Sequence, residues 1–175
     1  MSCTQTLTGI SRDCSPNSGG VRSVWLANKA DIESISLPSL DGSISSIEMK
    51  TGKSFFEYQF ARGTASLSSN YAVSAENGTK YVETDLVMVF NRMDVSKRKE
   101  LIALKGAELA GLVEDNNGKI WLIGLDRPLE MSAGDGLTGT AYADRNGYSI
   151  TLHDVSSQMP REYVGTMPPP EAVTP

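Results

Sequence analysis

Apolar and polar residues alternate with a period of two along much of the chain, which is the pattern of half-buried β-strands. The segment 21–27, VRSVWLA, is the first example, with Val24 and Leu26 on one face and Trp25 on the other. The preceding residues 1–20 are rich in Ser, Thr and Gly and show no periodicity. The pattern therefore predicts an extended N-terminal arm that leads into a strand.

Residues 43–60 show the same alternation on both sides of a turn-forming pair, Thr51-Gly52. The first half places Ile47 and Met49 on one face. The second half carries aromatic side chains on both faces of the predicted strand: Phe55, Phe56, Tyr58 and Phe60. The two halves are predicted to pair as a long hairpin, which follows a polar connection over 31–40.

Three further hairpins are predicted from turn sequences between apolar segments. The predicted strand pairs and their turns are 64–74 with 80–91 across Asn77-Gly78, 107–115 with 119–124 across Asn116-Asn117-Gly118, and 137–144 with 147–154 across Arg145-Asn146. The second half of 80–91 is apolar on both faces, which indicates a strand that runs through the core.

One segment predicts a helix. Asp94 is a favourable N-cap, and residues 95–105 contain neither Gly nor Pro before Gly106. A modest apolar stripe is predicted to cover a sheet face or a barrel end: Val95, Leu101, Ile102 and Leu104. The basic cluster Lys97–Lys99 lies beside Asp94 and Glu100, so we interpret it as a solvated helix face rather than a phosphate-binding site.

These elements predict a mainly β fold, namely a β-sandwich or barrel of antiparallel strands with one flanking α-helix at about 94–105. The chain divides into the extended arm at 1–20, a folded domain at 21–154, and an extended C-terminal tail at 155–175. This tail ends in the proline-rich sequence MPPPEAVTP and is too poor in apolar residues to form a core.

Composition argues against several classes of protein. Hydrophobic residues make up 39% and charged residues 21% of the 175 residues, as in globular proteins, and the net charge of −5 argues against a nucleic-acid-binding face. The longest apolar runs, at 86–90 and 120–125, are far shorter than the ~20 residues of a membrane helix. The N-terminus lacks the basic and apolar regions of a signal peptide, so synthesis and folding in a cytoplasm are expected.

No combination of residues predicts catalysis. His153 is the only histidine, and no nucleophile elbow, P-loop or zinc motif accompanies it, so we read it as a surface or packing residue. Asp115–Gly118 and Asp144–Gly147 contain the oxygen ligands of a calcium loop, but hairpin turns explain them without an ion. Cys3 and Cys14 are predicted to be free or packed thiols, because a cytoplasm disfavours disulfides. We expect no catalytic, cofactor or metal site.

Glu83 and Asp85 are two positions apart, so they share one face of the predicted strand 80–91. A glycosidase would bring its two carboxyl groups from separate elements to within roughly 5–10 Å, and nothing in the sequence indicates such a pair. The two acids indicate either a water-facing acidic row or an acidic wall inside an assembly.

The order of elements in residues 80–155 resembles that of bacteriophage tail tube proteins and related virion ring proteins. The resemblance rests on a capped helix and a strand, followed by EDNNGKIWLIGL and then by GTAYADRNGYSITLHD. It implies a β-sandwich with one flanking helix, whose copies assemble into six-fold rings. Stacked rings of such proteins form the conduit for DNA in the virion tail. The implied partners are copies of the chain and other tail or neck proteins, with no membrane and no specific DNA contact.

On this resemblance, the arm, the 43–60 hairpin and the proline-rich end are expected to contact neighbouring subunits. The expected contact residues are Cys14, Val21, Trp25, Ile47, Met49, Phe55, Phe56, Tyr58 and Phe60. Glu83 and Asp85 are expected to form an acidic lumen face that repels DNA and lets it slide.

Two other functions remain open at this point. The first is another ring protein of the neck or tail, such as a terminator or a connector. The second is a β-sandwich that binds carbohydrate on a platform of aromatic side chains, for which the candidates are Trp25, Phe55, Phe56, Tyr58 and Trp121.

Overall fold

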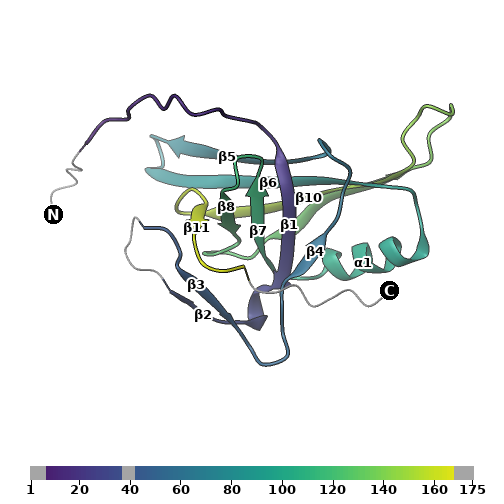
Figure 1. Cartoon of the computed structure of the whole chain (residues 1–175), viewed down its shortest axis with the longest axis horizontal. Helices are drawn as coiled ribbons and strands as arrows, with labels where there is room; N and C mark the ends of the chain where they lie inside the picture. The colour runs from purple at the N-terminus through teal and green to yellow at the C-terminus, as the bar shows by residue number, and fades with distance from the viewer. Residues whose placement is uncertain (1–6, 37–41, 168–175) are drawn as a thin grey trace.

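The computed structural model of the chain describes residues 7–36 and 42–167, and it is mainly β, with 49% strand and 9% helix. In the described part the elements are β1 (Val21–Asn28), the short 3-10 helix η1 (Lys29–Asp31), β2 (Ile32–Ser36), β3 (Ser46–Met49), β4 (Phe56–Tyr58), β5 (Ala65–Ser74), β6 (Thr79–Asn91), α1 (Val95–Lys105), β7 (Leu109–Asp115), β8 (Ile120–Ile123), β9 (Glu130–Leu137), β10 (Gly147–Ser156) and β11 (Arg161–Tyr163) (Figure 1).

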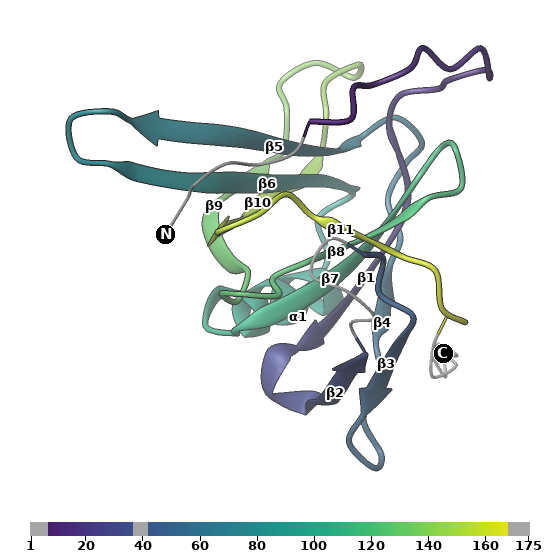
Figure 2. The same ribbon diagram turned by 90° about the vertical axis from the view of Figure 1, so that its left-hand side faces the viewer.

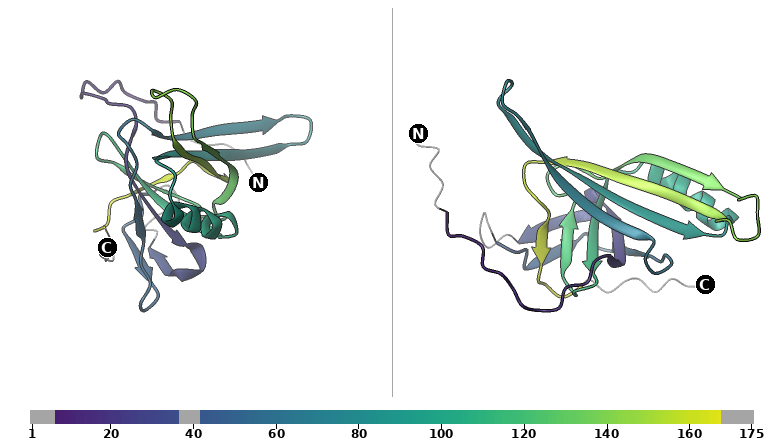
Figure 3. Two further views of the ribbon diagram at one scale, coloured as in Figure 1. Left: turned by 90° about the vertical axis from the view of Figure 1, so that its right-hand side faces the viewer. Right: turned by 90° about the horizontal axis from the view of Figure 1, so that it is seen from above.

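Two antiparallel sheets form a sandwich, which confirms the predicted fold class. One sheet has the strand order β11-β8-β7-β1-β4 and the other has the order β5-β6-β10-β9. Figure 2 shows the four-stranded sheet against one face of the five-stranded sheet, and the separate pair β2-β3 on the opposite side. The long strands β5 and β6 extend past the five-stranded sheet as a projecting hairpin (Figures 2 and 3).

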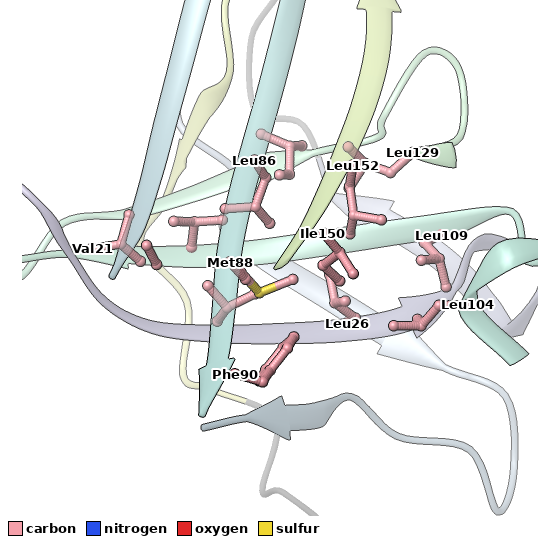
Figure 4. Close-up of a cluster of buried hydrophobic side chains, with 14 residues drawn as sticks. Val21, Leu26, Leu86, Met88, Phe90, Leu104, Leu109, Leu129, Ile150 and Leu152 are labelled. Carbon is pink, nitrogen blue, oxygen red and sulfur yellow. The ribbon is translucent and has the colours of Figure 1, made fainter. Parts of the chain in front are cut away.

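The main core lies between the two sheets and is drawn in Figure 4. Leu86 and Met88 of β6 and Leu152 of β10 are completely buried there. Val24 and Leu26 face them from β1, as the alternation in 21–27 predicts. The helix α1 closes one end of this core. Only Leu104 of its predicted apolar stripe is buried, whereas Val95 is 67% and Ile102 is 58% exposed, so the stripe is narrower than predicted.

A second core lies on the other face of the five-stranded sheet. Its buried members are Ala27, Ile44, Phe55, Leu112, Leu122 and Tyr163, and the pair β2-β3 covers them with Ile35, Ile47 and Met49. Trp25 also packs here, on the face of β1 opposite to Val24. The five-stranded sheet is therefore buried on both faces, which explains why β7 is apolar at consecutive positions.

The predicted hairpin over 43–60 is wrong. β3 pairs with β2, which lies in the predicted polar connection over 31–40, and β4 pairs with β1 through Trp25↔Glu57. The alternation indicates the strands correctly, but the partners are set by the second core, which both β3 and Phe55 help to fill. β4 pairs with a strand that is not adjacent in the sequence, so no turn sequence between the two strands could predict the pairing.

Two of the other hairpins are confirmed, and so is the capped helix. β5 pairs with β6 up to Ser74↔Thr79, and β7 pairs with β8. Asp94 caps α1, since its Oδ1 accepts a hydrogen bond from the Lys97 backbone N–H at 2.8 Å. These features depend on neighbouring residues, which is why their sequences predict them.

The predicted strand 137–144 is wrong. β9 ends at Leu137, which pairs with Gly147 of β10, and residues 138–146 form a loop. Asp144 folds this loop, because its carboxylate accepts hydrogen bonds from the backbone N–H groups of Ala141 and Thr140. The same two hydrogen bonds lower the pKa of Asp144.

The C-terminal tail begins later than predicted at residue 155. β10 continues to Ser156, and β11 adds a strand to the edge of β8 through Glu162↔Trp121. Tyr163 is only 4% exposed and belongs to the second core. The proline-rich residues 168–175, like Cys3, lie outside the described residues.

Asp154 links the two sheets. It is 4% exposed on the inner face of β10, and its Oδ2 accepts a hydrogen bond from the Gly124 N–H at 2.7 Å. Gly124 has a φ of 77°, and a Cβ there would lie 2.6 Å from the Leu109 carbonyl oxygen, so glycine is required. The Asp154 Oδ1 has no partner among the described residues and lies beside a cavity of about 20 Å³, enough for one water molecule. Burial raises the pKa of Asp154.

Asp154→Asn is expected to raise the melting temperature at pH 8 and to leave it nearly unchanged at pH 4. A raised pKa in the folded state means that this carboxyl stabilises the fold below its unfolded pKa of about 4, and that this contribution is lost as the pH rises through the folded pKa. The amide keeps an acceptor for Gly124 without the buried charge. Thermal unfolding of both proteins from pH 4 to 8 measures the difference.

Asp154→Ala is the control, since it removes the acceptor as well as the charge. It is expected to be less stable than Asp154→Asn by about 1–3 kcal/mol at every pH, because both variants lack the charge and the alanine leaves the Gly124 N–H buried and unpaired. A pH dependence of Asp154→Asn equal to that of the wild type would contradict this account.

Candidate assembly surfaces

The N-terminal arm from residue 7 to residue 16 lies on solvent, with every residue exposed (Figure 1). Leu7 is 92% and Ile10 is 102% exposed. The side-chain hydrogen bonds of this stretch are local, from the Ser15 N–H and hydroxyl to Asp13. Cys14 lies here too and is exposed. Leu7 and Ile10 are thus two large aliphatic side chains that lie on solvent in an otherwise polar, extended segment.

The base of the arm, residues 17–20, is held by the β7-β8 turn. Asn117 accepts from the Ser18 N–H and donates to the Asn17 side chain, at 2.8 and 2.9 Å. Asn116 donates through its side chain to the Gly19 carbonyl and through its backbone to the Gly20 carbonyl. The direction in which the arm leaves the sandwich is therefore defined by the fold.

The same turn settles the role of Asp115. Its Oδ1 accepts hydrogen bonds from the backbone N–H groups of Asn117 and Lys119, and its Oδ2 accepts one from the Trp121 indole. These bonds match the predicted hairpin turn and use the oxygens that a calcium ion would need. In the described ranges, no group of three or more His, Cys, Asp or Glu side chains is placed to hold a metal ion.

The nine expected contact residues have very different environments. Val21 and Phe55 are 7% and 1% exposed, because they pack into the main core and the second core of this chain. Five others are partly buried against one of the two cores: Trp25, Ile47, Met49, Tyr58 and Phe60. Phe56, which is 50% exposed, and Cys14 are the two that present most of their surface to solvent.

Glu83 and Asp85 do share one face of β6, the outer face of the four-stranded sheet. The residues opposite them on β5 are Asn70 and Ser68. On the other side, the Asp85 carboxylate is 2.8 Å from Nδ1 of His153 on β10. The outer face of this sheet thus carries two acids, one of which has a histidine partner, together with Val87 and Val89 of β6 and Val155 of β10.

The His153–Asp85 pair joins adjacent strands at a half-exposed position, with 34% and 38% of the two side chains exposed. In the described part of the chain, no hydroxyl or thiol is hydrogen-bonded to the imidazole. The pair therefore lacks the bonded nucleophile of a hydrolytic triad. Its position fits a cross-strand contact that stabilises the sheet.

Two projections were missed by the sequence predictions. The β5-β6 hairpin exposes Tyr71 and Val73, at 66% and 65%, where it extends past the five-stranded sheet. The loop 138–146 joins β9 to β10 and projects from the opposite end of the four-stranded sheet (Figure 1). Its Tyr142 is fully exposed. The length of the predicted strands 64–74 and 80–91, relative to 21–27 and 119–124, is the one signal that indicates an overhang.

A groove of about 310 Å³ separates the edge strand β4 from α1. Its lining is mostly apolar and includes Phe56, Phe90, Leu101 and Leu104. The Tyr58 hydroxyl donates a hydrogen bond to Glu100 at 2.5 Å and so ties β4 to the helix. Burial raises the pKa of Tyr58, and the bond to Glu100 raises it further.

No family model, no curated protein and no solved structure matches the chain. No helix in the described part of the chain is long and apolar enough to cross a membrane.

Proposed function

We propose that the chain is a virion structural protein, a tail tube subunit whose copies assemble into stacked six-membered rings that form a conduit for the genome. The main support for this proposal is the N-terminal arm, which combines exposed apolar side chains with a fixed base. Leu7 and Ile10 are exposed on a segment whose base is fixed by Asn116 and Asn117. A fixed base and an uncovered apolar end suit a contact between copies.

The acidic outer face of the four-stranded sheet supports the same proposal. Glu83 and Asp85 lie opposite Asn70 and Ser68 of β5. The same face also carries Val87 and Val89 of β6 and Val155 of β10. A face of this kind suits a lumen wall, because negative charge repels the phosphate backbone and lets DNA slide. The virion, and within it the tail, is the proposed location.

The same surfaces suit a terminator or connector ring, which is the second candidate. The carbohydrate platform has less support. Trp25 and Phe55 pack into the second core, whereas Tyr58 packs against the main core on the other face of the sheet. The aromatic side chains thus do not share one exposed face on which a sugar could stack.

Sedimentation of the purified full chain tests the proposal. Six copies of the 18.8 kDa chain have a mass of 6 × 18.8 = 112.8 kDa, and we expect this species or stacks of it. A monomer at the highest soluble concentration would contradict assembly of this chain on its own.

A further inference from the structure

The edge strand β4 has an unused side. It pairs only with β1 among the described residues and ends the five-stranded sheet. An unpaired strand edge presents backbone N–H and C=O groups to any extended segment that approaches it. The groove between β4 and α1 runs beside this edge and adds an apolar lining. A strand edge next to an apolar groove is a site for an added strand.

The N-terminal arm has the matching properties. It is extended from residue 7, it carries exposed Leu7 and Ile10, and its own chain leaves both uncovered. Residues 7–16 span up to about 33 Å when extended, which is enough to reach a neighbouring molecule.

The arm cannot easily fill the groove of its own chain. Figure 1 shows the arm leaving the start of β1 toward one side, while α1 lies on the opposite side of the sandwich. The view from above in Figure 3 shows the same separation. A contact between the arm of one copy and the groove of the next is head-to-tail, and contacts of this type generate closed rings or open filaments.

The charges around the groove also fit the arm. The charged residues that line the groove are Glu57, Lys97 and Glu100. The Lys97 ammonium is paired with Asp94, and the arm carries Arg12 two residues beyond Ile10. A segment with Ile10 in the apolar lining would bring Arg12 near these carboxylates. Complementary charge of this kind fixes the register of a contact.

We propose that the N-terminal arm of one copy binds between β4 and α1 of the next copy, as an added strand with Ile10 against the apolar lining. The inference rests on the proposed assembly of identical subunits and assigns its subunit contact. Phe56, the exposed aromatic residue of the groove, is covered by this contact.

Two charge substitutions test the contact in the full chain. Ile10→Asp on the arm and Phe56→Asp in the groove are each expected to raise the concentration at which assembly begins by at least about tenfold, since each replaces a buried apolar side chain with a charge. Ser11→Asp and Ile102→Asp are the matched controls. They add the same charge next to Ile10 and on α1 outside the groove lining, and are expected to change the concentration by less than about twofold.

Cross-linking keeps the test independent of any effect on folding. Both native cysteines are replaced by serine, and a chain with Ile10→Cys is mixed with a chain with Phe56→Cys. A disulfide between the two chains is expected under oxidising conditions, and the mixture of Ile10→Cys with Ile102→Cys is expected to give none.

The outcomes separate this inference from the proposed function. If the wild type assembles but Ile10→Asp and Phe56→Asp assemble equally well, the arm binds elsewhere and the inference is wrong, while the ring proposal stands. If the two cross-linked mixtures give equal yields, the groove is also not the binding site. If the wild type remains a monomer, the ring proposal and the inference both fail.

Discussion

Deletion of residues 1–16 is expected to leave the melting temperature within about 2 °C of the full-length value and to abolish assembly. The described part of this segment is exposed throughout, and its side-chain hydrogen bonds are local to the arm. The deletion stops before Asn17, whose side chain is bonded to Asn117. Calorimetry and sedimentation of the truncated chain measure the two effects separately.

The longer deletion of residues 1–20 is the control for the position of the cut. It removes the hydrogen bonds that Asn116 and Asn117 make to the base of the arm, and it should lower the melting temperature as well. A large loss of stability from the shorter deletion would show that the arm belongs to the folded domain. Full assembly of the chain that lacks residues 1–16 would show that the arm is not a subunit contact.

Leu86→Ala is expected to destabilise the protein by about 2–5 kcal/mol, the usual cost of a large cavity in a core. Leu86 is completely buried between the two sheets. Its neighbour Val87 is on the outer face of the same strand, so Val87→Ala is the matched control and is expected to cost less than about 1 kcal/mol. Denaturant unfolding of the two variants compares the two faces of β6 directly.

This comparison also tests the position of the acidic residues, because Val87 lies on the same face as Glu83 and Asp85. Equal losses of stability from the two substitutions would mean that both faces are packed within one chain. The outer face could not then line a lumen.

Features that depend on adjacent residues could be predicted from the sequence. The β5-β6 turn at Asn77-Gly78 and the cap at Asp94 lie as predicted, since the conformation of each is determined by the residues themselves. The alternation in 21–27 also places Val24 and Trp25 on opposite faces correctly.

Features that depend on residues far apart in the sequence could not be predicted in this way. The strand 46–49 alternates as a strand should, but its partner β2 is set by the core that Phe55 and Tyr163 fill together. β11 has only three residues, too few to show a period. Its place is determined by the free edge of β8 and by the burial of Tyr163.

The contact surface was only partly predictable for a related reason. Alternation indicates which residues share a face, and the usual inference is that one face of a sheet is on solvent. Here the second core covers the other face of the five-stranded sheet, so Val21 and Phe55 lie on different faces and both are buried. The burial of the Asp154 carboxyl could not be predicted from the sequence. Asp154 is the last residue of the predicted strand 147–154, where a polar side chain is usually on solvent.

Electron microscopy of the purified full-length chain tests the central claim most directly. The account predicts closed rings or tubes roughly 100 Å wide with a central lumen, and the truncation of residues 1–16 under the same conditions should show isolated subunits. Isolated subunits in both samples, with no ring at any concentration, would contradict it.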